Sequence, residues 1–166
     1  MREPIKDRTR LEHIKDAILR ILDNTKDLSL DQLSANVLVY YGVVKNIEII
    51  GEAAYNLTAA YRESHPETPW KDVMRMRNVL VHDYYRIDER EVWYVIEDNL
   101  APLLAQVNHY LAETNWEEWE NDEQAKAESA VYKSLMQTAR RMKLRGYEES
   151  EICKITGLTA EEIKAI

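Results

Sequence analysis

The sequence predicts an all-α protein. Only four glycines and four prolines occur in 166 residues, fewer than a fold with many turns or hairpins requires. Apolar residues recur at steps of three and four along most of the chain, which is the spacing of amphipathic helices, and no alternating strand pattern fits as well. Phenylalanine is absent, so ten tyrosines and four tryptophans supply the aromatic part of the core.

Two amphipathic stretches open the chain. Residues 7–24 carry an apolar stripe at helical spacing. Ser29 followed by Gln32 has the form of a capping box, which places a helix start there. The apolar positions then continue to Leu57, so we expect a long second helix with a break near Asn36.

A third helix should follow the polar, proline-bearing loop at residues 62–68. Thr68 and Pro69 are typical of an N-cap and a first helical residue, and we expect the helix to end between residues 82 and 85. Its inward positions are Trp70, Val73, Met76 and Leu80.

A fourth helix should open with Asp88 and Glu91, which have capping-box spacing. It should run to Leu111, and Pro102 should bend or split it because proline lacks the backbone donor.

The composition changes after this fourth helix. We expect a bundle over residues 1–113, a junction over the acidic, tryptophan-bearing residues 114–124, and a helical extension over residues 125–166. Within the extension, Gly146 and Gly157 are expected helix ends, and Thr159 with Glu162 forms another capping box. Two short helices around a glycine turn have the outline of a helix-turn-helix unit.

Charge and cysteine content exclude several function classes. There are 22 basic and 30 acidic side chains, a formal charge of −8, which argues against general binding to nucleic acid or to an anionic membrane. The one cysteine, Cys153, excludes an internal disulfide framework and a cysteine zinc cluster. We expect a cytoplasmic protein with no membrane partner, because no apolar run reaches the length of a bilayer span and the first residues lack the apolar middle of a signal peptide.

A polar cluster at the end of the third expected helix is the main candidate for chemistry. Residues 71–90 carry five basic side chains against four acidic ones, although the chain as a whole is acidic. On a regular helix Arg75, Asn78 and His82 share one face, while Arg77 lies about 140° of rotation from His82. Either the long guanidinium of Arg77 swings toward the imidazole where the helix loosens, or the two groups meet across two subunits.

These residue types suit phosphodiester cleavage without a metal ion. An arginine binds and neutralises a phosphate, a histidine with a pKa near neutrality exchanges a proton, and an asparagine orients either group. The reaction would use a ribose 2′-hydroxyl that attacks the adjacent phosphorus, so the substrate would be RNA. On spacing alone a structural alternative stays open, in which His82 caps the helix dipole and the arginines pair with Asp72, Asp83 or Asp88.

The segment RNVLVHDY places Arg77, His82 and Tyr84 at a spacing that matches a known pattern. It closely resembles the R-x4-H-x-Y signature of the HEPN superfamily and, within it, of HepT-like toxins that pair with a minimal nucleotidyltransferase antitoxin. A bare R-x4-H arises by chance in many helices, but here further blocks occur in the same order. The resemblance covers roughly residues 8–112, including RLEHIKDAI at 10–18 and IEIIGEAAYNLT at 47–58.

The resemblance implies an up-and-down HEPN bundle that dimerises, so that two motif helices form a composite cleft. It implies the toxin of a type VII-like toxin–antitoxin pair, a metal-independent endoribonuclease that uses no cofactor. Arg77 would hold the scissile phosphate, His82 would act as acid or base or position the ribose, and Asn78 would support both. Tyr84 would accept AMP from the antitoxin, and the added bulk and negative charge would block RNA.

The same resemblance implies the partners. These are an RNA substrate, a second copy of the chain in a homodimer, and a cognate nucleotidyltransferase (MntA-like) antitoxin, with which higher hetero-oligomers can form. The rival hypothesis is a HEPN protein without catalysis that serves as a binding and assembly module for a nucleotidyltransferase-like partner. Unchanged toxicity of a His82→Ala variant would favour this rival.

Other polar residues carry weaker predictions. Glu52 either faces the cleft and binds Arg77 or occupies a helix contact, and Arg75 is a possible supporting group. Tyr85 is an adjacent phenol that competes with Tyr84 as the modified residue. No histidine or carboxylate pair has metal-ligand spacing. We expect no ligand role for the isolated His13 and His65, and we expect His109 to lie at the surface.

The extension has a basic segment, with five positive and no negative side chains between residues 133 and 145. This segment could contact nucleic acid, including operator DNA, or an acidic partner surface. Alternatively it is a solvated face opposite an Ala/Leu/Met stripe that packs on the bundle or on a second subunit. The basic residues are Lys133, Arg140, Arg141, Lys143 and Arg145.

Overall fold

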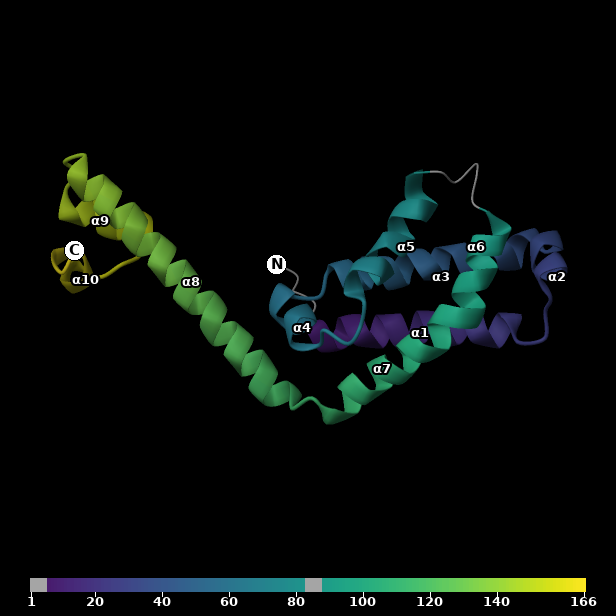
Figure 1. Ribbon diagram of the computed structural model, residues 1–166. Helices are drawn as coiled ribbons and strands as arrows, with labels where there is room; N and C mark the ends of the chain where they lie inside the picture. The colour runs from purple at the N-terminus through teal and green to yellow at the C-terminus, as the bar shows by residue number, and fades with distance from the viewer. Residues whose placement is uncertain (1–5, 83–87) are drawn as a thin grey trace. The chain divides into compact units, whose positions relative to one another are not determined.

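The structure, a computed structural model, describes residues 6–82 and 88–166, and it describes side chains there except those of residues 77–82. In the described part of the chain the regular structure is helical and no strand occurs, which confirms the all-α prediction (Figure 1). The chain divides into two compact units, Met1–Thr114 and Asn115–Ile166.

Helix α3 is the centre of the N-terminal unit. It packs against α1 on one side and against α5 on another, and α7 lies along α1 (Figure 1). The elements of this unit are α1 (Asp7–Thr25), α2 (Leu30–Ala35), α3 (Val37–Tyr55), α4 (Ala59–Ser64), α5 (Trp70–His82), α6 (Glu89–Tyr94), the π-helical η1 (Val95–Asn99) and α7 (Leu100–Glu113).

The core of this unit follows the predicted stripes. Burial of these aliphatic side chains supplies most of the stability that holds the helices together, at about 1.5–3 kcal/mol for each fully buried side chain. The main members are Leu11, Ile14, Ile18 and Ile21 of α1, Ile47, Ile50 and Ala54 of α3, and Leu100, Leu103 and Val107 of α7. In α5, Trp70 and Val73 are buried as predicted, Met76 is half-buried, and Leu80 lies outside the described side chains.

Side-chain caps set several of the helix boundaries. Ser29 and Gln32 form the predicted capping box at the start of α2. Asn36 ends α2 and caps α3, which confirms the predicted break. Asp88 caps α6, but its carboxylate accepts from the backbone N–H of Arg90 rather than from that of Glu91.

Pro102 does not split its helix, and the local backbone geometry shows how the proline is accommodated. A proline cannot donate to the carbonyl four residues earlier and its ring crowds that carbonyl. The preceding segment η1 widens to π-helical geometry, in which the N–H of Leu100 donates to the carbonyl of Val95. The polypeptide therefore stays helical from Glu89 to Glu113 without a break.

Two segments differ from the sequence predictions. Residues 62–64 belong to the short helix α4, which Thr58 caps by accepting from the N–H of Tyr61. Residues 116–124, where a junction was expected, are the first part of α8 (Trp116–Leu144). The helix begins here because Asn115 caps it and because the carboxylates of Glu117 and Glu118 interact favourably with its positive N-terminus.

The C-terminal unit has a small core of its own. Helix α8 packs against α9 (Glu149–Thr156), and α9 packs against α10 (Ala160–Lys164). Gly146 and Gly157 follow helix ends as predicted, each with a positive φ, and Thr159 with Glu162 forms the predicted capping box. The buried residues are Ala139, Ile152, Leu158 and Ile163, with Leu135, Met136, Met142, Cys153 and Ile166 packed around them.

None of the helices in the described ranges has both the length and the apolar character needed to cross a bilayer.

Candidate functional site

Three hydrogen bonds anchor the start of α5, the helix that carries the motif. The hydroxyl of Thr68 hydrogen-bonds to the phenol of Tyr110 and donates to Oε1 of Gln106, at 3.0 Å, both on α7. The indole N–H of Trp70 donates to the carbonyl of His65 at 2.9 Å. Since these groups are buried or half-buried, their hydrogen bonds fix the position of the first turn of α5.

An aromatic cluster forms this anchor. The ring of His65 stacks on Tyr61 at 4.3 Å between centroids and meets Tyr110 edge-on at 4.4 Å. His65 lies in the loop after α4 as expected, but its ring packs in this cluster and is not isolated. Burial raises the pKa of Tyr110 to about 12, which keeps this phenol protonated and able to bond to Thr68.

The motif residues lie at the far end of α5. The backbone of Arg77, Asn78 and His82 is helical and belongs to the last turns of α5, which packs on α3. The side chains of these three residues lie outside the described ones, as do Tyr84 and Tyr85 altogether. Their spacing on one helix is therefore as predicted, and their side-chain roles stay predictions.

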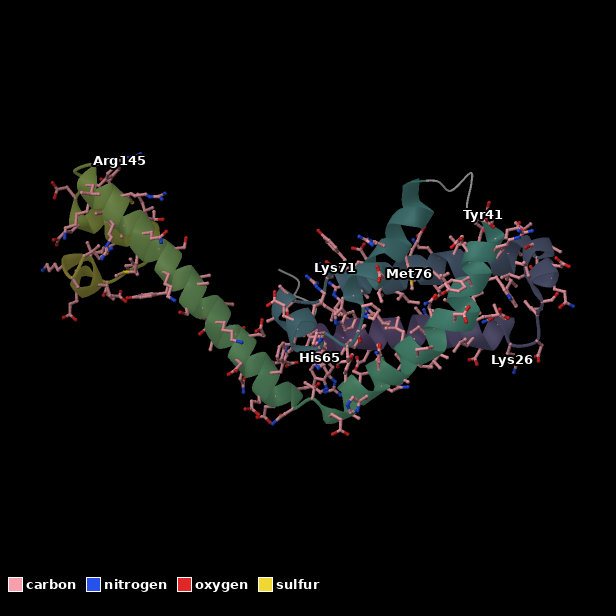
Figure 2. All side chains as sticks on the ribbon, in the orientation of Figure 1. Lys26, Tyr41, His65, Lys71, Met76 and Arg145 are labelled. Atoms are coloured by element: carbon pink, nitrogen blue, oxygen red, sulfur yellow. The ribbon has the colours of Figure 1, made fainter. Side chains whose placement is uncertain are left out.

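Arg75 pairs with a nearby aspartate, which is the structural alternative to a role in RNA binding. Its Nη1 lies 3.3 Å from Oδ1 of Asp72, three residues earlier on α5, and its side chain is 74% exposed. Such a solvated pair contributes little stability. Figure 2 labels Lys71 and Met76, which flank this pair on the part of α5 whose side chains are described.

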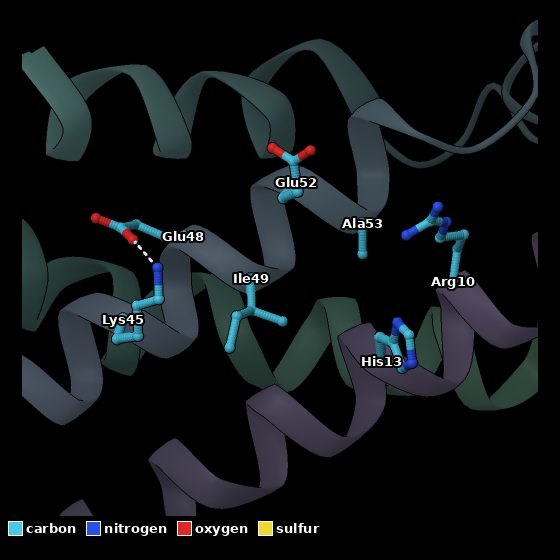
Figure 3. Close-up of a pocket in the computed structure, with 7 residues that line it drawn as sticks. All are labelled: Arg10, His13, Lys45, Glu48, Ile49, Glu52 and Ala53. Carbon is cyan, nitrogen blue, oxygen red and sulfur yellow. Dashed lines mark hydrogen bonds and ion pairs between the residues drawn. The ribbon is translucent and has the colours of Figure 1, made fainter. Parts of the chain in front are cut away.

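Glu52 lies on α3, the helix that supports α5. Its Oε1 accepts from Nδ2 of Asn56 at 2.8 Å and the residue is exposed. In Figure 3 its carboxylate points away from α1. The proposed contact between Glu52 and Arg77 stays a prediction, because the Arg77 side chain is not described.

A pocket of about 350 Å³ opens between α1 and α3, with Glu52 at its wall (Figure 3). Arg10 and His13 reach into it from α1, and Lys45, Ile49 and other residues at helical spacing line it from α3. Lys45 is paired with Glu48 across 2.7 Å. The Nε of Arg10 is buried and has no hydrogen-bond partner among the described residues.

Sequence reasoning missed this pocket. Arg10 and Lys45 lie in different helices and become neighbours only when α1 packs on α3. The single available signal was the three-residue step from Arg10 to His13, which puts both on one face of α1. His109 is exposed, and the described His, Cys, Asp and Glu side chains form no group of three that could hold a metal ion.

Comparison with known proteins decides the family. The family model described as "Ribonuclease HepT-like" matches residues 14–110, more than half of the chain. The chain belongs to this HepT-like ribonuclease family. The match spans α1 to α7 and includes the whole segment from Arg77 to Tyr84.

Individual relatives agree with this HepT-like assignment. A protein of Thermococcus cleftensis named "Probable ribonuclease HepT" is 32% identical over 93 residues, which are 56% of this chain and 84% of the relative. A protein of Caldanaerobacter subterraneus named "Putative RNase TTE0752" is 33% identical over 101 residues, 61% of this chain and 90% of the relative. No solved structure gives a significant match. The family match ends before α8, so the C-terminal unit lies outside it.

Proposed function

We propose that this HepT-like chain is the toxin of a toxin–antitoxin pair, an endoribonuclease that cleaves RNA without a metal ion. The observation that carries the proposal is the family match over residues 14–110, which contains the segment RNVLVHDY in full. The helical backbone from Trp70 to His82 supports it, because Arg77, Asn78 and His82 then project from a single rigid element.

The chemistry assigns one role to each residue. Arg77 binds the scissile phosphate through its planar fork of donors. His82 removes the proton of the ribose 2′-hydroxyl or returns a proton to the leaving 5′-oxygen. Asn78 orients one of these two groups. The 2′-oxygen forms a bond to phosphorus as the bond to the 5′-oxygen breaks, which leaves a 2′,3′-cyclic phosphate.

We propose that the site is completed by a second copy of the chain. Arg77 and His82 are five residues apart on α5 and therefore lie about 140° apart around the helix axis. One helix cannot easily present both groups to the same phosphate. Two motif helices facing each other in a homodimer would bring Arg77 of one chain near His82 of the other.

Neutralisation is proposed to occur by AMPylation of Tyr84. The phenol oxygen attacks the α-phosphorus of ATP on a nucleotidyltransferase antitoxin, pyrophosphate leaves, and the phenol proton passes to solvent. The bound AMP adds a phosphate two residues from His82, which would repel and displace RNA. Tyr85 is the alternative acceptor.

Cleavage of RNA by purified variants tests the catalytic part. His82→Ala and Arg77→Ala should each lower the rate at least a hundredfold, because general acid–base catalysis and phosphate binding each contribute about that much. Arg8→Ala is the charge-matched control, since Arg8 forms an exposed pair with Glu12 on α1. Wild-type activity in His82→Ala would instead favour a non-catalytic HEPN module.

The mass of the intact protein tests the regulatory part. Coexpression with the cognate nucleotidyltransferase should add one or more AMP masses, and the modified peptide should contain Tyr84. Tyr84→Phe should lose the addition and Tyr85→Phe should keep it. An unmodified toxin in the neutralised complex would indicate inhibition by binding alone.

A further inference from the structure

One face of α5 carries a line of polar residues that leads to the histidine of the motif. Each residue of an α-helix is rotated by about 100° from the one before it. Four polar residues therefore fall within about 60° of one another around α5, and we name them the α5 track: Lys71, Arg75, Asn78 and His82. The side chains of Lys71 and Arg75 are exposed, and the other two positions continue their face by helical register.

Lys71 is the available cation of the α5 track. It is exposed, and among the described side chains no carboxylate forms an ion pair with it (Figure 2). Arg75 differs, because Asp72 lies 3.3 Å from its Nη1. Lys71 therefore offers an uncompensated positive charge on the face of α5 that leads to His82.

A pocket of about 590 Å³ opens beside Lys71, between α4 and the start of α5. Its apolar lining includes Pro66, Trp70 and the half-buried Met74. The Nη1 of Arg62 donates to carbonyls at the end of α3, which fixes this side chain in the wall. The charged residues of the lining are Arg62, Lys71, Arg75, Glu63 and Asp72. Apolar surface next to a free cation suits the base and the phosphate of a single-stranded nucleotide.

We propose that the RNA beside the cleavage site follows the α5 track, with one phosphate bound by Lys71 and the adjoining nucleotide in the pocket. This inference rests on the proposed ribonuclease function. Lys71 and His82 are eleven residues apart, which is about 16 Å along the helix axis. Stacked nucleotides rise about 3.4 Å each, so at most about five of them separate the phosphate at Lys71 from the one at His82.

Binding of an RNA that cannot be cleaved tests the α5 track without relying on catalysis. The probe is a short single-stranded RNA that is 2′-O-methylated throughout, so it has no 2′-hydroxyl to attack phosphorus. Lys71→Glu should weaken its binding to the full-length protein several-fold in fluorescence anisotropy. Lys26→Glu is the charge-matched control and should bind like wild type, because Lys26 is an exposed lysine at the end of α1, away from α5 (Figure 2).

The salt dependence of binding distinguishes a phosphate contact from a loss of folded protein. Each phosphate that a protein neutralises on a single strand adds about 0.7 to the slope of log affinity against log salt. Lys71→Ala should lower this slope by about 0.7, whereas a partly unfolded variant would keep the wild-type slope. Asp72→Asn should raise the affinity, because it frees the guanidinium of Arg75.

Cleavage kinetics test whether the contact at Lys71 serves the reaction. Lys71→Ala should act on KM far more than on kcat, because a distant phosphate is bound equally in the ground state and the transition state. Shortening the RNA nucleotide by nucleotide on the side that reaches Lys71 should raise KM for the wild type. The same shortening should leave the KM of Lys71→Ala unchanged.

Three outcomes of the binding experiment would overturn the α5 track. Equal affinities of wild type and Lys71→Glu would show that RNA does not reach Lys71, and equal weakening by Lys26→Glu would show a response to overall charge alone. Loss of binding to a protein partner in Lys71→Glu, with RNA binding unchanged, would assign this face of α5 to that partner. Binding that depends on Lys71 in a protein that does not cleave RNA would support the track and reject the proposed catalysis, so the two proposals fail separately.

Discussion

A buried carboxylate joins the first helix to the segment before the motif helix. Asp7 is 6% exposed and accepts from the N–H of Thr58 at 2.8 Å and from its hydroxyl at 2.7 Å. Thr58 in turn caps α4. The two hydrogen bonds hold two segments that lie 51 residues apart in the sequence.

Asp7→Ala should therefore lower the free energy of unfolding by about 2–3 kcal/mol, because hydrogen bonds to a buried charged group are costly to lose. Denaturant unfolding followed by circular dichroism measures the change. Asp16→Ala, an exposed position on the same helix, should stay within about 0.5 kcal/mol of wild type. Equal effects of the two substitutions would show that the Asp7 contacts add nothing.

Because the pKa of the Tyr110 phenol is raised, we expect the folded protein to lose stability at alkaline pH. Burial raises its pKa from 10.0 to about 12, so between these values the unfolded chain has lost a proton that the folded protein retains. The free energy of unfolding should thus be at its full value below pH 10 and fall as the pH rises toward 12. Tyr61, with a pKa of about 12 for the same reason, adds to this decline.

Tyr110→Phe separates the two effects of this phenol. It should cost about 1 kcal/mol at neutral pH through the lost bond to Thr68, and it should make the alkaline decline shallower. Denaturant titrations at a series of pH values measure both. A decline as steep as in wild type would mean that another group controls alkaline stability.

At the scale of helices, two glycines differ in what a methyl group would do. Gly42 lies inside α3 with open space around the position of a Cβ, so Gly42→Ala should raise the free energy of unfolding by about 0.5–1 kcal/mol. Gly157 has equal space but a φ of +72°, so Gly157→Ala should cost about 1–2 kcal/mol through backbone strain. Thermal unfolding of both variants measures this contrast, and the same sign for both would contradict it.

Helix positions could largely be predicted from the sequence, because caps and apolar spacing are local signals. Ser29, Asn36 and Thr159 cap helices where the sequence places them. The first part of α8 was missed because residues 116–124 lack an apolar stripe and their helicity depends on the Asn115 cap and the acidic first turn.

The candidate site was only partly predictable. The motif spacing from Arg77 to His82 lies within one helix and was read directly. The pocket that contains Arg10 and Lys45 depends on the packing of α1 on α3. Local sequence patterns do not predict which helices pack together. The anchor of α5 on His65 and Tyr110 was missed for the same reason.

At the scale of the molecule, the two units should unfold separately. The C-terminal unit has a core of four buried residues, whereas the core of the N-terminal unit is several times larger. Ile163→Ala removes a fully buried side chain at a typical cost of about 2–5 kcal/mol, which approaches the whole stability expected of so small a unit.

Amide hydrogen exchange measures this independence. In Ile163→Ala, protection should fall in α9 and α10 and stay unchanged in α1, α3 and α7. Leu11→Ala, at a fully buried position of α1, is the matched substitution in the other unit and should show the reverse pattern. Loss of protection throughout the chain in either variant would mean that the units fold as one.

We propose that this HepT-like protein cleaves RNA through the residues of α5, with the ribose 2′-hydroxyl as nucleophile. The most direct measurement is the cleavage of a defined RNA by the purified protein in the presence of a chelator, with analysis of the product ends. We expect products that end in a 2′,3′-cyclic phosphate, no cut at a position with a 2′-deoxyribose, and no activity in His82→Ala. Cleavage that requires an added divalent metal, or that persists in His82→Ala, would contradict it.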